Sequence, residues 1–130
     1  MGKILQENID IAIDQYFERA QNLQTAVLLA WKDTNIENIR SIFAACVSLS
    51  SLYSDCLTPL LCINDTSNRV IFAMKPVHDA IKPFLSRANR VIRSDSRVEI
   101  DEMLDVVHEA ECISTNLSLV RLGWLALKEK

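Results

Sequence analysis

Glycine and proline are scarce in this chain, and their scarcity restricts the possible folds. The 130 residues contain 2 Gly and 3 Pro. A β-sandwich or barrel uses such residues in its many turns, so the composition favours a few long elements. With two glycines far apart, no Gly-rich loop exists to hold a nucleotide phosphate. The sequence therefore indicates an architecture more directly than it indicates a biochemical activity.

Long apolar runs are also missing. No uninterrupted run is longer than the six residues from Ala26 to Trp31, whereas a membrane-spanning helix needs roughly 18 to 20 apolar residues. The N-terminus carries Lys3 and then acidic residues, where a signal peptide would need an apolar block. We therefore expect a cytoplasmic protein without a membrane partner.

The cysteines do not follow a metal-binding or redox pattern. Cys46, Cys56, Cys62 and Cys112 form no C-x-x-C pair. Free cysteine behaves as a small apolar residue, and disulfides are rare in the cytosol. We expect all four to be reduced and most of them to be buried.

Charge is distributed unevenly, although the formal net charge is only −3. The segment from Arg69 to Arg97 holds seven basic residues, and the segment from Glu99 to Glu111 holds six acidic residues and no basic one. A basic block followed directly by its own counter-charge favours a seam of salt bridges between neighbouring helices. Nucleic-acid binding is not expected, because it would require an unopposed basic patch.

Apolar residues recur at intervals of three and four along four segments, which indicates amphipathic helices. The predicted helices cover residues 3–32, 35–58, 67–93 and 97–128. Thr34 with Glu37, and Ser96 with Glu99, match the capping box at two of the helix starts. Short connections make successive helices antiparallel neighbours. The predicted fold is all-α, an antiparallel up-down-up-down four-helix bundle that forms one domain over residues 1–130.

Two prolines lie inside the third predicted helix. Pro76 and Pro83 differ by about 20° in a helical projection, and both lie away from the apolar side. We expect a continuous helix that bends around the core, although an interior proline costs about 3 kcal/mol. The alternative is a break, with Pro76 in the first turn of a new helix.

The end of the fourth predicted helix is apolar on all sides. The residues that surround its axis are Leu119, Leu122, Trp124, Leu125 and Leu127. One bundle interior covers only one side of a helix, so either segment 57–63 or a second molecule must cover the remainder. We favour a homodimer or partner surface with Trp124 as its anchor.

These observations favour a non-enzymatic bundle that acts through protein–protein contacts, as an adaptor, a chaperone-like factor or a regulatory accessory factor. Its partner is another protein or a second copy of the chain. We expect no catalytic residue, no cofactor and no metal site.

One alternative function involves a histidine. The six residues His78-Asp79-Ala80-Ile81-Lys82-Pro83 resemble the phospho-acceptor box of sensor histidine kinases, in which an acid follows the histidine and a proline lies five residues on. Lys82 departs from that pattern, because the family has a small polar residue before the proline. The resemblance implies a phosphotransfer protein in which His78, exposed on a helix flank, accepts a phosphoryl group.

Acidic pairs give a second alternative. Glu7-x-x-Asp10 and Glu102-x-x-Asp105 resemble the paired motifs of all-helical nucleotide pyrophosphohydrolases, which hold magnesium against the phosphates of a substrate. Both pairs lie away from the apolar sides of their helices, whereas a magnesium site needs convergent carboxylates. Asp105-x-x-His108 matches half of the di-iron pattern of helical bundles, but the inward carboxylates are missing. Metal binding is therefore not expected.

Overall fold

The computed structural model describes residues 2–58, 65–94 and 99–129, with side chains for 8–58, 69–94 and 99–129. The helices are α1 (Gly2–Lys32), α2 (Ile36–Leu52), α3 (Asp65–Arg93) and α4 (Ile100–Lys128), with a short π-helix, η1 (Tyr53–Leu57), that continues α2. No strand occurs in these ranges. The prediction of an all-α fold is confirmed.

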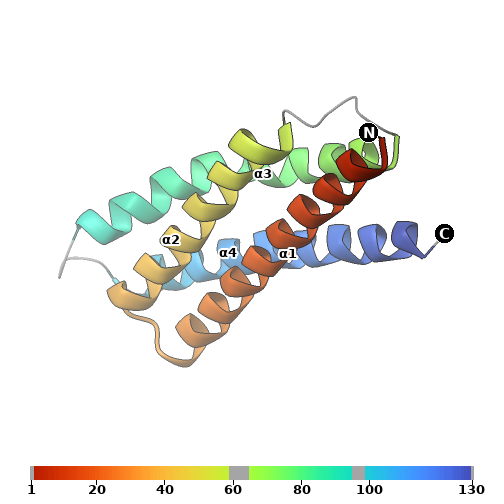
Figure 1. Ribbon diagram of the computed structural model, residues 1–130. Coiled ribbons are helices and arrows are strands. Elements are labelled where there is room, and N and C mark those ends of the chain that lie inside the picture. The colour runs from red at the N-terminus through yellow and green to blue at the C-terminus, as the bar shows by residue number, and fades with distance from the viewer. Residues whose placement is uncertain (1, 59–64, 95–98, 130) are drawn as a thin grey trace.

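The four helices run alternately in opposite directions (Figure 1). Helix α1 packs against α2 and α4, and α3 packs against the same two helices, so the four form a closed ring. The start of α1 and the end of α4 therefore lie at the same end of the bundle (Figure 1). The predicted up-down-up-down topology is confirmed. Among the described residues no helix has the length and apolarity that crossing a membrane requires.

The core draws on all four helices. Ile13 and Leu23 of α1, Ile42 of α2, Met74 of α3 and Leu117 of α4 are all buried. Burying one such side chain completely stabilises the folded chain by roughly 1.5 to 3 kcal/mol. The same three-and-four spacing that predicts the helices thus also predicts which of their sides meet in the interior.

The turn between α1 and α2 differs from the predicted capping box. Asn35 is the N-cap of α2, and its Oδ1 accepts a hydrogen bond from the backbone N–H of Asn38 at 2.9 Å. The hydroxyl of Thr34 instead donates to the carbonyl of Ala30 at 2.8 Å, at the end of α1. The pairing of Thr34 with Glu37 was therefore wrong, because the last turn of α1 offers the hydroxyl an acceptor.

The remaining helix ends agree with the predictions to within a few residues. The helical path that starts with α2 reaches Leu57 through η1, close to the predicted end at residue 58. Helix α3 starts at Asp65 and α4 at Ile100. Glu99 is the N-cap position of α4 but makes no capping hydrogen bond through its side chain. Its proposed partner Ser96 lies outside the described residues.

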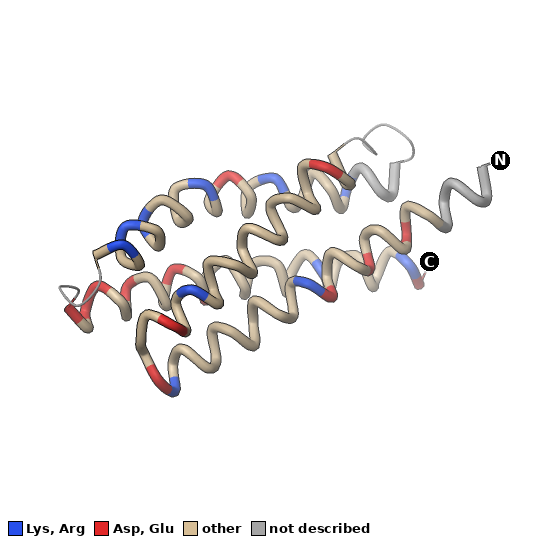
Figure 2. Tube along the Cα trace, turned by 60° about the vertical axis from the view of Figure 1, so that its left-hand side comes forward, with Lys and Arg blue, Asp and Glu red and all other residues tan. Residues whose placement is uncertain are grey.

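Helix α3 passes through both of its prolines without a break. Pro76 and Pro83 are exposed, and α3 follows a bowed path (Figure 2). The expected continuous, bent helix is confirmed. A proline on the convex side is tolerated because the carbonyl that loses its hydrogen-bond partner faces water.

The cysteines are more exposed than predicted. Cys46 is buried in the core, where burial raises the pKa of its thiol to about 12. Cys56 and Cys112 are exposed, and both are free thiols. The prediction that most cysteines are buried is wrong for these two, and Cys62 lies outside the described residues.

Candidate functional site

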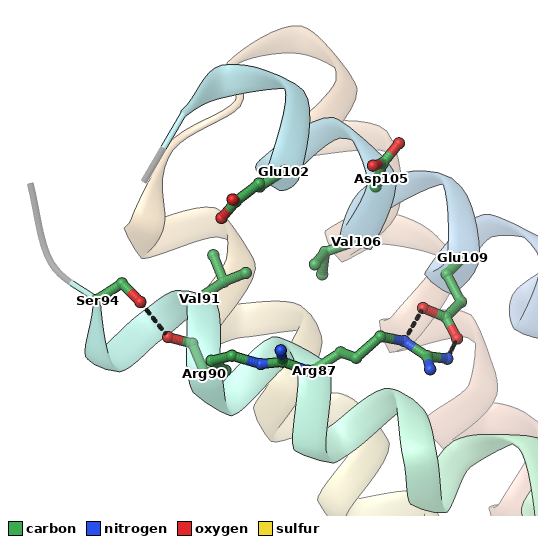
Figure 3. Close-up of a pocket in the computed structure, with 8 residues that line it drawn as sticks. All are labelled: Arg87, Arg90, Val91, Ser94, Glu102, Asp105, Val106 and Glu109. Atoms are coloured by element: carbon green, nitrogen blue, oxygen red, sulfur yellow. Dashed lines mark hydrogen bonds and ion pairs between the residues drawn. The ribbon is translucent and has the colours of Figure 1, made fainter. Parts of the chain in front are cut away.

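The first candidate region is the charged groove between α3 and α4. A bidentate ion pair joins Arg87 to Glu109, with Nε of the arginine 2.9 Å from a carboxylate oxygen and Nη2 on the other oxygen (Figure 3). Figure 2 shows basic positions of α3 beside acidic positions of α4 at the end of the bundle where α3 ends and α4 begins. One ion pair of the expected salt-bridge seam is therefore present between α3 and α4.

A hollow of about 250 Å³ opens next to the ion pair. Its lining consists of Arg87, Arg90, Val91, Ser94, Glu102, Asp105, Val106 and Glu109. Two guanidinium groups and three carboxylates share this space, so neither an anion nor a cation meets a uniform field. The hollow is therefore best explained as a solvent-exposed extension of the charged contact between α3 and α4.

The residues of the proposed metal motifs do not converge. Glu102 and Asp105 lie near the start of α4, whereas Asp10 lies near the start of α1, at the opposite end of the bundle (Figure 1). The side chain of Glu7 lies outside the described residues, and His108 is exposed. Within the part of the chain that the structure describes, no three His, Cys, Asp or Glu side chains are placed to hold a metal ion.

The second candidate region is a polar cluster around His78. The hydroxyl of Tyr16 lies 2.6 Å from Nε2 of His78, so α1 and α3 are joined by a short hydrogen bond. The ring of Tyr53, from η1, stacks on the imidazole with centroids 3.9 Å apart and planes 9° apart. The imidazole is thus held on one side by a hydroxyl and on one face by an aromatic ring.

Burial keeps this cluster uncharged at neutral pH. It lowers the pKa of His78 from 6.5 to about 4, although the negative charge of Asp79 acts in the opposite direction. Burial likewise raises the pKa of Tyr16 well above its usual value of 10.0. The hydroxyl therefore keeps its proton and donates a hydrogen bond to Nε2 when the imidazole hydrogen is on Nδ1.

The environment of His78 differs from the exposed flank position that the sequence predicts. The side chain is half-buried, because Tyr16 and Tyr53 close over it from two other elements. A π-helix has a wider turn than an α-helix, and η1 begins at Tyr53. Sequence periodicity does not reveal that turn, so it could not predict the stacking.

The third candidate region is the end of α4, where the structure separates the predicted interface residues. Leu119 and Leu122 are 61% and 62% exposed, and Leu125 is 38% exposed. Leu127 is half-buried. Trp124 is only 2% exposed and belongs to the core. Its prediction as the surface anchor is wrong, because α1 of the same chain covers it.

Trp124 is held by an acidic residue of α1. Its indole N–H donates to Oδ1 of Asp14 at 3.0 Å, and Nζ of Lys128 lies 3.0 Å from Oδ2 of the same carboxylate. Burial would raise the pKa of Asp14, but the hydrogen bonds from Trp124 and Lys128 and the charge of Lys128 outweigh it and lower the pKa. The buried tryptophan thus has a satisfied polar end.

Five exposed, uncharged residues follow one another along the outer side of α4. They are Cys112, Thr115, Leu119, Leu122 and Ala126, and we call them the outer stripe. Their spacing alternates between three and four, so they form a single row on the helix. Trp124 and Leu117 point to the opposite side, into the core. The sequence contains this spacing, which could have predicted the stripe, but Trp124 was predicted as the centre of the surface instead.

Uncharged surface continues from the outer stripe onto α3. A groove of about 400 Å³ runs between the two helices. Its lining consists of Ala73, Pro76, Val77 and Ala80 from α3, and Ile113, Asn116, Leu119 and Val120 from α4. Leu119 and Leu122 form a ridge on α4, and Leu119 also lines this uncharged groove.

Comparisons with protein families, with curated proteins and with solved structures find no match for this chain.

Proposed function

We propose that this protein is a non-enzymatic four-helix bundle that acts by binding a protein, either another chain or its own second copy, through the outer stripe of α4. The observation that carries the proposal is the exposure of Leu119 and Leu122, which are neighbours on one helix and each more than 60% exposed. Contiguous apolar surface of this kind is typical of protein–protein contact sites.

Covering the ridge provides a driving force for binding. Complete burial of a leucine contributes roughly 1.5 to 3 kcal/mol, and both side chains keep more than half of their surface in water. A partner that covers both therefore gains about 2 to 4 kcal/mol from these two side chains alone. The groove beside them adds further uncharged contact area.

The other two regions are better explained as structural. The groove with Arg87 and Glu109 joins α3 to α4 through an ion pair of opposite charges. In the second region, Nε2 of His78 is engaged by Tyr16 and the ring is stacked on Tyr53. A phosphoryl transfer through Nε2 would require that hydrogen bond to break, so the phosphotransfer alternative gains no support from this arrangement.

The proposal is tested by photo-crosslinking in the cells that produce the protein. A benzophenone amino acid at position 122 is expected to give a covalent product with a protein, and the same probe at Ala44 is not. Ala44 is exposed on α2, which lies diagonally across the ring from α4. Equal yields at the two positions, or no product from probes at both 119 and 122, would refute the proposal.

A further inference from the structure

We propose that the partner of the outer stripe is a second copy of this chain, bound in antiparallel fashion about a two-fold axis that passes between Leu119 and Leu122. This inference rests on the proposed function and names its partner. Three features of the stripe carry it: its spacing, its symmetry and its lack of charge.

The spacing of the outer stripe fits another helix. Residues that alternate at intervals of three and four keep a seam of 3.5 residues per turn, which is the repeat that packs one helix along another. The stripe extends from Cys112 to Ala126, a distance of about 21 Å at 1.5 Å per residue. A helix of the same length, such as α4 itself, covers it from end to end.

Four of the five stripe residues are also placed symmetrically about the point between residues 120 and 121, and Cys112 has no counterpart within the stripe. A two-fold axis there places Leu119 of one copy against Leu122 of the other, and Thr115 against Ala126. In an isologous contact each residue pair occurs twice, so both copies bury the same ridge. Gly123 lies beside this point, and a Cβ atom placed there would meet nothing within 4 Å. The surface next to the axis is therefore open to a second helix.

The lack of charge removes the main obstacle to pairing between identical chains. The chain carries a formal net charge of −3, so two copies repel each other in general. The outer stripe itself has no ionisable side chain except the thiol of Cys112, and the α3 side of the groove is lined by Ala73, Pro76, Val77 and Ala80. Along the outer stripe and its α3 side, two identical copies can therefore meet without placing like charges together.

The size of the contact can be estimated from the dimensions of the outer stripe. A stripe about 21 Å long, with one neighbouring groove on each side at helix spacings of 8 to 10 Å, covers roughly 400 Å² per copy in plan. The two copies together therefore bury roughly 800 Å². That area lies below the usual range for stable complexes, which predicts a weak, reversible dimer.

Sedimentation of the intact chain between about 1 and 300 µM tests the dimer. The wild-type protein is expected to shift from monomer to dimer over this range, and Leu122→Asp to stay monomeric with unchanged helicity. Val47→Asp is the matched control, because Val47 is an exposed apolar residue on α2. This control is expected to dimerise like the wild type. A dimer that survives in Leu122→Asp contradicts the proposed surface.

Disulfide trapping tests the orientation, in a background without Cys56, Cys62 and Cys112. Chains with Thr115→Cys and chains with Ala126→Cys are oxidised separately and as a mixture. The antiparallel dimer crosslinks only in the mixture. Residue 115 of one copy lies about 16 Å along the helix axis from residue 115 of the other, and the same holds for residue 126. Crosslinking of each variant with itself would instead show a parallel pair and refute the inference.

The two proposals can fail separately. A wild-type chain that stays monomeric at 300 µM refutes the second copy. If the probe at 122 then crosslinks to a different protein, the proposed function stands with another partner. If it crosslinks to nothing, both proposals fail.

Discussion

The half-buried His78 predicts that acid destabilises this protein in a defined pH window. Burial lowers the pKa of the imidazole from 6.5 to about 4 in the folded chain, whereas the unfolded chain keeps the ordinary value. Between these two pH values the unfolded state binds one more proton than the folded state. The free energy of unfolding therefore falls as the pH is lowered from about 6.5, and the loss is complete near pH 4.

The size of the effect follows from the same two values. A pKa difference of one corresponds to about 1.4 kcal/mol, so a drop from 6.5 to about 4 amounts to at most about 3 kcal/mol. The ring keeps partial contact with water, which makes this an upper limit. A domain of this size has a total stability of about 5 to 15 kcal/mol, so the loss is large enough to measure.

Urea unfolding at pH 7, 6, 5 and 4, followed by circular dichroism, measures this loss. The matched control is His78→Gln, whose amide oxygen can still accept the hydrogen bond from Tyr16 but which does not titrate. Subtracting the loss of the variant from the loss of the wild type leaves the part that belongs to the imidazole. The wild type is expected to lose up to about 3 kcal/mol more than the variant between pH 7 and pH 4. A difference that stays constant across this range would refute the assigned burial of His78.

Three further predictions concern single side chains. Tyr16→Phe leaves Nε2 of His78 without its partner and is expected to lower the free energy of unfolding by about 1 to 3 kcal/mol in urea titrations. Trp124→Ala is expected to cost about 3 to 5 kcal/mol. Asp14→Ala is expected to cost less than half of that, because it removes the partner of the indole N–H and of Lys128 but leaves the buried ring in place. Similar losses would contradict the core position of Trp124. Pro83→Ala, on the exposed side of α3, is expected to raise the melting temperature because it restores a helix hydrogen bond. The gain in the free energy of unfolding is at most about 3 kcal/mol. An unchanged or lower melting temperature would show that the bend is needed.

Local pattern was sufficient to predict the helices of this protein. The spacing of residues such as Ile13, Leu23 and Met74 places apolar side chains on one side of each helix, and that side is buried. The prolines of α3 were correctly assigned to its outer side for the same reason. Helical periodicity depends only on residues within a few turns, so it can be read without knowing the tertiary contacts.

The candidate site depended on contacts between distant parts of the chain. The exposed leucines of α4 were among the residues that the sequence singled out, but Trp124 was assigned to the same surface. The indole N–H of Trp124 bonds to Asp14, 110 residues away in the sequence, and the hydroxyl of Tyr16 bonds to His78 across 62 residues.

The sequence by itself determined four amphipathic helices and an end of α4 that no single core could cover. Only the tertiary structure decided which part of that end remains exposed, because the answer depends on where α1 packs. Packing buried Trp124 and enclosed His78, and it left Leu119 and Leu122 in water. A helix pattern gives the direction of a side chain around its own axis, whereas burial also depends on what lies in that direction.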